Sequence, residues 1–324
     1  MSLKSRWNEF KASIQPRKKE LKFMFTRIKK SPLSIVGTAI IVFYIALAIL
    51  APVLSPPWPG RDPFMIPRKV YLIAPKPPSP EHIFGTAQGS YDIYYGCIWG
   101  TITAFRVGIV VVGISLVIGL IIGTLAGYYG GILDELMMRL TDIFLAFPGL
   151  VLCIALVVSL PSNLTIIELG SLKWTLPLGP LDKLLLALAI VGWPSYCRVI
   201  RGEVMRIKAE DYIQASRAVG CSDFRVITRH ILPNSIYPIL IMASLDIGAI
   251  VLTAAALSFL GLGSPTGYAD WGQLISLSKS YIEASLEYWY TYIIPGLFIF
   301  TFVLGWNLLG DAFRDILDPM LRRR

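Results

Sequence analysis

The sequence contains few charged residues, and several of its long stretches contain none. Only 16% of its 324 residues are Asp, Glu, Lys or Arg, whereas a soluble domain has about 25%. Hydrophobic residues make up 55% of the chain. This composition excludes an ordinary soluble protein and predicts a chain that crosses a membrane several times.

The motifs of several enzyme classes are also missing. The sequence has no Gly-Lys pair, so it cannot form the loop that cradles ATP phosphates. It has two histidines, His82 and His230, without an H-E-x-x-H motif, and no G-x-S-x-G. The four cysteines are scattered without a C-x-x-C and are typical of small buried residues. We therefore expect no catalytic residue, metal site or cofactor on this chain.

The uncharged runs predict six membrane-spanning helices. A run of about 20 apolar residues is long enough to cross the hydrocarbon core of a bilayer. The fourth run is short, but the basic stretch that follows it must share a side of the membrane with the basic N-terminus, which requires an even number of crossings between them. The predicted spans are 33–54, 98–129, 137–160, a fourth around 184–197, 235–262 and 288–310.

Basic residues predict the side of the membrane on which each loop lies. Residues 1–31 contain ten Lys or Arg against two Glu, and segments with such an excess stay in the cytoplasm. Apolar residues recur there at near-helical spacing, which favours an amphipathic surface helix over the alternative, a disordered basic tail. We divide the chain into this segment (1–32), the first span with a proline-rich outer segment (33–97), and the remaining membrane domain (98–324).

Two sets of residues within the spans are candidates for helix packing. Gly119, Gly123 and Gly127 recur every four residues, a pattern that lets a neighbouring helix approach closely. Arg139 and Asp142 are three residues apart on one predicted helix, where they can form an ion pair.

Asp246 is a carboxylate within the fifth predicted span. Because a charge at membrane depth is costly, such a residue is a candidate for the translocation path. The alternative is a protonated or hydrogen-bonded packing residue. In the third span, Pro148 predicts a bend or a break.

The longest charged stretch of the second half, 203–233, predicts a cytoplasmic loop made of a helix, a sharp turn and a second helix. The run 211–219 is rich in helix-forming residues, and Gly220 can take the left-handed conformation that ends a helix. Ser222 is placed to cap a short helix over 223–230. At Pro233 the chain is predicted to turn back toward the membrane.

This stretch also has the spacing of a known motif. Gln214-Ala215-Ser216 is followed after three residues by Gly220, and after nine more by the run that begins at His230 and ends at Pro233. It resembles the EAA motif of ABC importer permeases, which reads E-A-A, three residues, G, nine residues, I-x-L-P. Gln214, Ser216 and His230 depart from the motif, and the HILPN ending is similar to that of the peptide-transporter branch.

The resemblance extends from about residue 20 to the C-terminus. Stretches 82–92, 126–148, 257–275 and 307–319 resemble segments of dipeptide and oligopeptide permeases. In 82–92, Ala87 and Tyr91 replace the Asp and the Arg of the family pattern. The resemblance implies an all-α membrane protein with the type I ABC importer permease fold, six transmembrane helices and a cytoplasmic coupling loop, in a prokaryotic inner membrane with both termini cytoplasmic.

The resemblance also implies the partners. A second homologous permease would form the path with this chain, two cytoplasmic ATPase subunits would bind ATP and Mg²⁺, and an extracytoplasmic solute-binding protein would deliver the solute. The residues implied in ATPase coupling are Glu210, Asp211, Tyr212, Gln214, Ala215, Ser216, Ala218, Gly220, Cys221, Ser222, Arg225, His230, Leu232 and Pro233. The sequence leaves open whether the solute is a peptide, an oligosaccharide or a metal complex. A passive channel and an intramembrane enzyme are remote alternatives.

Overall fold

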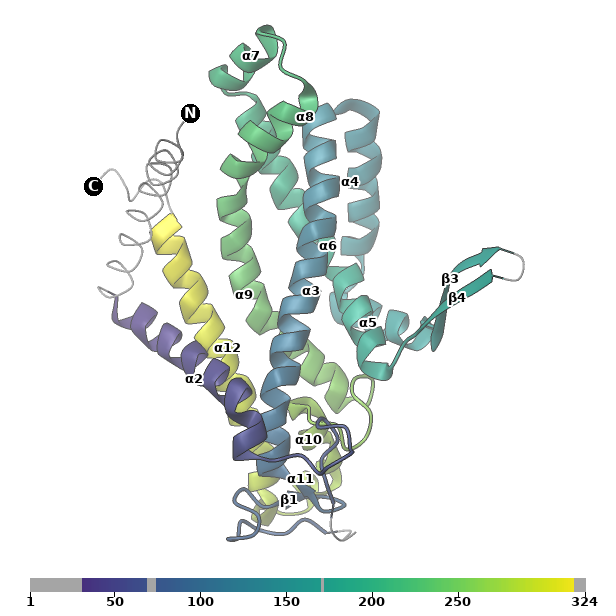
Figure 1. Cartoon of the computed structure of the whole chain (residues 1–324), viewed down its shortest axis with the longest axis vertical. Coiled ribbons are helices and arrows are strands. Elements are labelled where there is room, and N and C mark those ends of the chain that lie inside the picture. Colours follow the sequence, from purple (N-terminus) through teal and green to yellow (C-terminus); the bar gives the residue numbers. More distant parts are fainter. Residues whose placement is uncertain (1–30, 69–73, 170–171, 318–324) are drawn as a thin grey trace, which may run out of the picture.

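The computed structural model describes residues 31–68, 74–169 and 172–317, so the predicted amphipathic segment falls almost entirely outside the described residues. Long helices form an elongated bundle, with α7 and α8 at one end and β1, α10 and α11 at the other (Figure 1). The long helices are α2 (Pro32–Leu54), α3 (Ile93–Tyr129), α4 (Gly131–Ala146), α5 (Gly149–Ser159), α6 (Pro180–Lys208), α9 (Leu232–Phe259) and α12 (Tyr290–Leu317).

The remaining elements are short. Two antiparallel ribbons pair β1 (Thr86–Ala87) with β2 (Tyr91–Asp92) and β3 (Asn163–Leu169) with β4 (Leu172–Pro177), and the second projects from the side of the bundle (Figure 1). The short helical elements are α7 (Asp211–Ala218), α8 (Asp223–Val226), the π-turn η1 (Ile227–Ile231), α10 (Trp271–Leu277), α11 (Lys279–Ala284) and the 3₁₀ turn η2 (Leu286–Tyr288).

The described residues include five helices that are long and apolar enough to cross a membrane, and a sixth span if the bent pair α4 and α5 counts as one. The all-α membrane fold is therefore confirmed. The first span starts where the sequence dictates, because Ser31 accepts a hydrogen bond from the Ser34 amide and Pro32 occupies the first turn. The second span begins at Ile93, earlier than predicted, because the Asp92 carboxylate caps it at the Tyr95 amide (2.8 Å).

The third span is broken, which confirms the prediction at Pro148. Helices α4 and α5 meet at an angle of 93°. Pro148 has no N–H to continue the α4 hydrogen bonds, and it forces Phe147 into an extended conformation (φ −90°, ψ 143°). Helix α4 begins at Gly131, earlier than the predicted span.

The fourth span is longer than its uncharged core. Helix α6 includes Arg198 and Arg201, which lie against α4: Arg198 donates to Asp142, and Arg201 donates to both carboxylate oxygens of Asp134 (2.7 and 2.5 Å). The helix therefore continues past its uncharged core, because Arg198 and Arg201 both have acidic partners on α4.

The predicted ion pair between Arg139 and Asp142 is wrong. Arg139 instead donates to Glu135 (2.6 Å), one turn earlier on α4. Asp142 lies on the face of α4 that meets α6, so its partner is Arg198 from that helix.

Helix α9 passes through the bundle and approaches two neighbours closely near its middle. A Cβ on Gly108 of α3 would lie 2.6 Å from Ile247 of α9, and a Cβ on Gly248 would lie 3.3 Å from the Val303 carbonyl oxygen of α12. The absence of side chains at the two glycines lets α9 contact both neighbours at this level.

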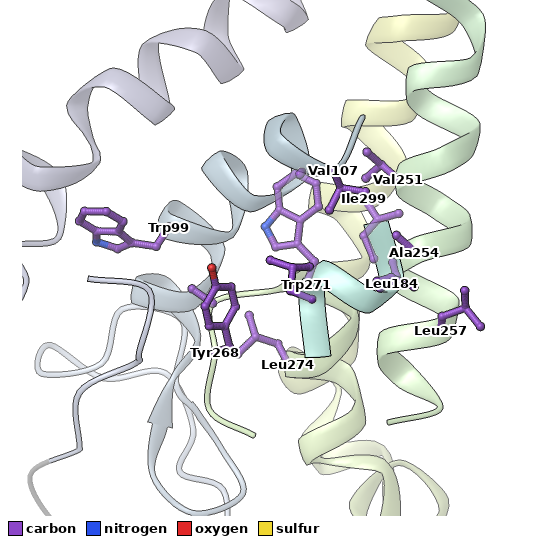
Figure 2. Packing of buried hydrophobic residues seen from close by; sticks show 14 of the residues in the cluster. Trp99, Val107, Leu184, Val251, Ala254, Leu257, Tyr268, Trp271, Leu274 and Ile299 are labelled. Atoms are coloured by element: carbon purple, nitrogen blue, oxygen red, sulfur yellow. The ribbon is translucent and has the colours of Figure 1, made fainter. Parts of the chain in front are cut away.

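A buried cluster closes the bundle at the end that carries α10. Trp271 of α10 donates its indole N–H to the Cys97 carbonyl oxygen (3.0 Å), and Trp99 of α3 donates to that of Ser55 (2.9 Å). These bonds tie α10 and the chain after α2 to α3. Figure 2 shows side chains of this cluster from several helices and the loop before α10: Trp99, Val107, Leu184, Val251, Ala254, Leu257, Tyr268, Trp271, Leu274 and Ile299.

Asp270 fixes the loop between α9 and α10. Its buried carboxylate accepts hydrogen bonds from the hydroxyls of Ser258 (3.1 Å) and Ser264 (3.0 Å) and from the Gln273 amide (3.0 Å). Burial nevertheless raises the pKa of the Asp270 carboxyl above its usual value, because the loss of solvation outweighs these bonds.

We expect Asp270 to make stability depend on pH. Because its pKa is raised in the folded state, the folded protein binds this proton more tightly than the unfolded chain, and lowering the pH from neutral toward the ordinary Asp value of 3.8 stabilises it. The gain is at most about 1.4 kcal/mol per pH unit. The check is the unfolding midpoint of wild type against Asp270→Asn across this range. Parallel pH profiles of the two proteins would contradict the expectation.

Candidate functional site

Helices α7 and α8 form a small unit at the end of the bundle, between α6 and α9 (Figure 1). Ile213 of α7 is fully buried, whereas the other α7 residues are exposed or half-buried. It packs in a cluster with Ile207 of α6, Val226 of α8 and Ile231 of η1. The unit is therefore anchored on the bundle by buried apolar side chains, and its other side faces outward.

The turn between the two helices depends on Gly220. Its φ is +83°, the left-handed conformation that the sequence predicts. The amides of Gly220 and Cys221 donate to the carbonyl oxygens of Arg217 (3.0 Å) and Ser216 (3.1 Å), which closes the end of α7. A Cβ at Gly220 would meet no atom within 4 Å, so the requirement for glycine is conformational rather than steric.

The second helix of the loop differs from the prediction in two ways. Ser222 occupies the N-cap position, but its side chain makes no capping hydrogen bond. The chain does not turn at Pro233 either, because α8, η1 and α9 form one continuous helix over Asp223–Phe259. The π-turn accounts for the tolerated proline. The Leu232 amide bonds to the Ile227 carbonyl, five residues back, and Pro233, which has no N–H to donate, directly follows this wider turn.

Tyr128, at the end of α3, contacts the α7–α8 unit from the side of the bundle. The sequence motif does not include this residue. Its hydroxyl donates to Asp223 of α8 (2.5 Å), and its carbonyl oxygen accepts from the Lys208 ammonium at the end of α6. The spacing of residues in the sequence could not predict this contact, because Tyr128 lies 95 residues before Asp223.

The outward surface of the unit combines polar groups with large apolar side chains. Tyr212, Val219 and Phe224 are 45%, 81% and 77% exposed. The residues predicted from the motif do not include Val219 and Phe224, because the motif does not specify these two positions. Of the predicted coupling residues, Glu210, Asp211, Tyr212, Gln214, Ala215, Ala218, Gly220, Ser222, Arg225 and Pro233 are exposed, and Ser216, Cys221, His230 and Leu232 are half-buried.

The other predicted residues lie within the bundle. Asp246 of α9 is half-buried beside Tyr196 of α6. A Cβ on Gly119, Gly123 or Gly127 of α3 would lie 2.5, 2.5 or 2.8 Å from the nearest atom of α6. Within the part of the chain that the structure describes, no three His, Cys, Asp or Glu side chains group together to hold a metal ion.

Comparison with known families decides the identity. Residues 119–323 match the family described as binding-protein-dependent transport system inner membrane component, and residues 21–69 match the N-terminal transmembrane domain of oligopeptide transport permease C. The chain is a member of this permease family. The first match covers the end of α3 and everything after it, including α7 and α8.

Curated relatives span almost the whole permease. It is 37% identical to the dipeptide transport system permease protein DppC of Alkalihalophilus pseudofirmus, over 92% of this chain and 89% of the relative. It is 36% identical to the probable D,D-dipeptide transport system permease protein DdpC of Escherichia coli, over 90% and 89%. It is 34% identical to the oligopeptide transport system permease protein OppC of Bacillus subtilis, over 92% and 88%.

A solved structure shares the fold. The inward-facing MetNI methionine ABC transporter contains a chain that aligns with 68% of this permease and 96% of its own length, with a TM-score of 0.52 and 19% identity. The permease is thus a multi-pass membrane protein with the fold of an ABC importer subunit.

Proposed function

We propose that this chain is one of two permease subunits in an ATP-driven importer of peptides. The observation that carries the proposal is the α7–α8 unit, which is anchored by Ile213 and presents Tyr212, Val219 and Phe224 to the solvent. Large apolar side chains that are exposed on a unit with a buried anchor support a surface that another protein covers. The names of the relatives, which are dipeptide and oligopeptide permeases, support peptides as the solute.

In this proposal the partner that covers α7 and α8 is an ATPase subunit in the cytoplasm, so both chain ends are cytoplasmic. ATP and Mg²⁺ bind to two such subunits and not to this chain, which has no phosphate-binding loop. In this proposal the chain transports the solute and catalyses no reaction. A second, homologous permease completes the path, and a solute-binding protein docks at the opposite end, near β1 and α10.

The proposed mechanism is alternating access by rigid-body movement. Closure of the ATPase dimer moves α7 and α8 together, because the buried anchor and the turn at Gly220 fix their relative angle. The movement passes into α9 without an intervening loop, since α8 and α9 are one helix. The two permeases then rock between inward-open and outward-open states around a path that includes Asp246.

The test begins with purification of the tagged chain in mild detergent, mass spectrometry of the co-purified proteins and an ATPase assay. We expect a second permease and an ATPase. Reconstituted into liposomes with its binding protein, the complex is then given labelled peptides, oligosaccharides and metal complexes, and uptake is measured with and without ATP. Uptake of oligosaccharide alone would overturn the peptide assignment, and uptake without ATP would support a passive channel.

A substitution at Gly220 tests the coupling role of the turn. In Gly220→Val, a β-branched residue must adopt the left-handed conformation, which costs roughly 1–2 kcal/mol and distorts the angle between α7 and α8. We expect solute-stimulated ATP hydrolysis to fall several-fold while the complex still assembles. Gly220→Asn is the matched control, because asparagine tolerates this conformation. Normal stimulation in the valine variant would contradict the role.

A further inference from the structure

We propose that Tyr128 is a positioning residue that transmits movement of α7 and α8 into α3. The inference rests on the proposed function, in which an ATPase moves these two helices. It concerns a residue outside the coupling loop itself, on the helix that packs most extensively along α6.

Tyr128 contacts the elements on either side of the loop turn. Its side chain is 2% exposed, so it is held on all sides. The hydroxyl donates to Asp223 at the start of α8. On the ring, the Arg217 guanidinium of α7 lies 5.7 Å from the centroid and the Lys208 ammonium of α6 lies 5.5 Å away. Lys208 also donates to the Tyr128 carbonyl. One side chain thus joins both coupling helices and the end of α6.

The backbone of α3 next to Tyr128 cannot move independently of α6. Gly127 precedes it, and a Cβ there would lie 2.8 Å from the Arg201 carbonyl oxygen and 3.1 Å from Val204. Helices α3 and α6 are therefore in backbone contact just beneath the Tyr128 ring. Asp223 and Arg217 are themselves exposed, so the link to Tyr128 consists of the hydrogen bond from its hydroxyl and the contact of its ring with the guanidinium. Through these contacts, a displacement of α8 or α7 is passed to Tyr128 and to the end of α3.

The neighbouring tyrosine provides a matched control. Tyr129 is 54% exposed, and the ring contact that it makes is with Tyr128 (centroids 5.2 Å apart, edge to face). Tyr129→Phe removes a hydroxyl from the same turn of the same helix and leaves that ring contact in place. Tyr128→Phe likewise keeps its ring and its contacts with Arg217 and Lys208, and removes the hydrogen bond to Asp223.

The experiment measures solute uptake per ATP hydrolysed in the reconstituted complex. We expect Tyr128→Phe to lower this ratio roughly tenfold, the equilibrium factor for losing one hydrogen bond to a charged group. Asp223→Ala should lower it equally, and the double variant should show no further loss, because both changes remove the same bond. Asp223→Asn, which keeps an acceptor oxygen, should retain most of the wild-type ratio, as should Tyr129→Phe.

Three results would overturn the inference. They are a wild-type ratio in Tyr128→Phe, an equal loss in Tyr129→Phe, and a loss that follows the amount of assembled complex, which would make Tyr128 a packing residue. Failure of the proposed function looks different: the wild-type complex would then import nothing with ATP, and the role of Tyr128 would fall with it. Coupled uptake in wild type with equally coupled uptake in Tyr128→Phe rejects the inference alone.

Discussion

Gly123→Val is expected to separate α3 from α6 and to lower the unfolding midpoint of the protein in detergent by roughly 5 °C or more. A Cβ at Gly123 would lie 2.5 Å from the Cys197 carbonyl oxygen, 3.1 Å from Ile200 and 3.2 Å from the Arg201 amide. These are mostly backbone atoms of α6, so no rotamer change relieves the contact and the helices must move apart. Thermal unfolding followed by loss of monodisperse protein is the measurement.

Gly113→Val is the matched control for this prediction. Gly113 lies on the same helix, is exposed, and a Cβ there would meet no atom within 4 Å. Valine is a better helix former than glycine, so the midpoint should stay within about 1 °C of wild type or rise slightly. Equal destabilisation of the two variants would show that the loss of glycine itself, and not the contact with α6, is responsible.

Arg201→Met is expected to destabilise the protein by about 2–3 kcal/mol. Arg201 holds α6 to α4 through two hydrogen bonds to Asp134, and the two side chains are 31% and 17% exposed. Removing one partner leaves the Asp134 carboxylate desolvated without compensation. The figure lies below that of a fully buried pair because solvent screens part of the interaction. The measurement is again the unfolding midpoint, or the denaturant midpoint where unfolding is reversible.

A nearby pair on α4 separates this effect from the general loss of a charge. Arg139 and Glu135 are 73% and 60% exposed, and Arg139→Met should change stability by about 0.5 kcal/mol or less. Adding Asp134→Asn to Arg201→Met should recover part of the loss, because the unpaired charge is then gone. If the double variant is as unstable as the sum of the single ones, the two residues do not act as a pair.

Much of the fold could be predicted because its signals are local. Long uncharged runs define the spans, Pro148 indicates the break between α4 and α5, and Gly220 indicates the turn after α7. The limits of α6 could not be predicted in the same way. Arg198 and Arg201 read as the start of a loop, and their partners Asp142 and Asp134 lie 56 and 67 residues earlier in the chain. Ion pairs with a distant helix thus keep these residues in a helix, although the local sequence predicts a loop.

The sequence predicted the exposed part of the candidate site but not the buried residues that hold it in place. The motif register selects the exposed residues around Gly220, yet the anchor Ile213 and the supporting Tyr128 are not part of it. The expected capping by Ser222 follows from local preference, whereas in the structure its neighbour Asp223 accepts the hydrogen bond from Tyr128. The prediction that the chain turns at Pro233 was wrong for a similar reason. Proline normally interrupts a helix, but the π-turn just before Pro233 lets the helix continue through it.

The continuous helix from α8 through α9 has a mechanical consequence. At 1.5 Å per residue its 37 residues make a rod about 55 Å long. Among its contacts with neighbouring helices, it meets α3 at Ile247 and α12 at Gly248, about two-thirds of the way from the end that carries α8. In the proposed importer, a swing of α8 about this contact would move the far end of α9 by a smaller distance, because the arm beyond Ile247 is about half as long. That far end is where α9 meets α10 and the loop held by Asp270.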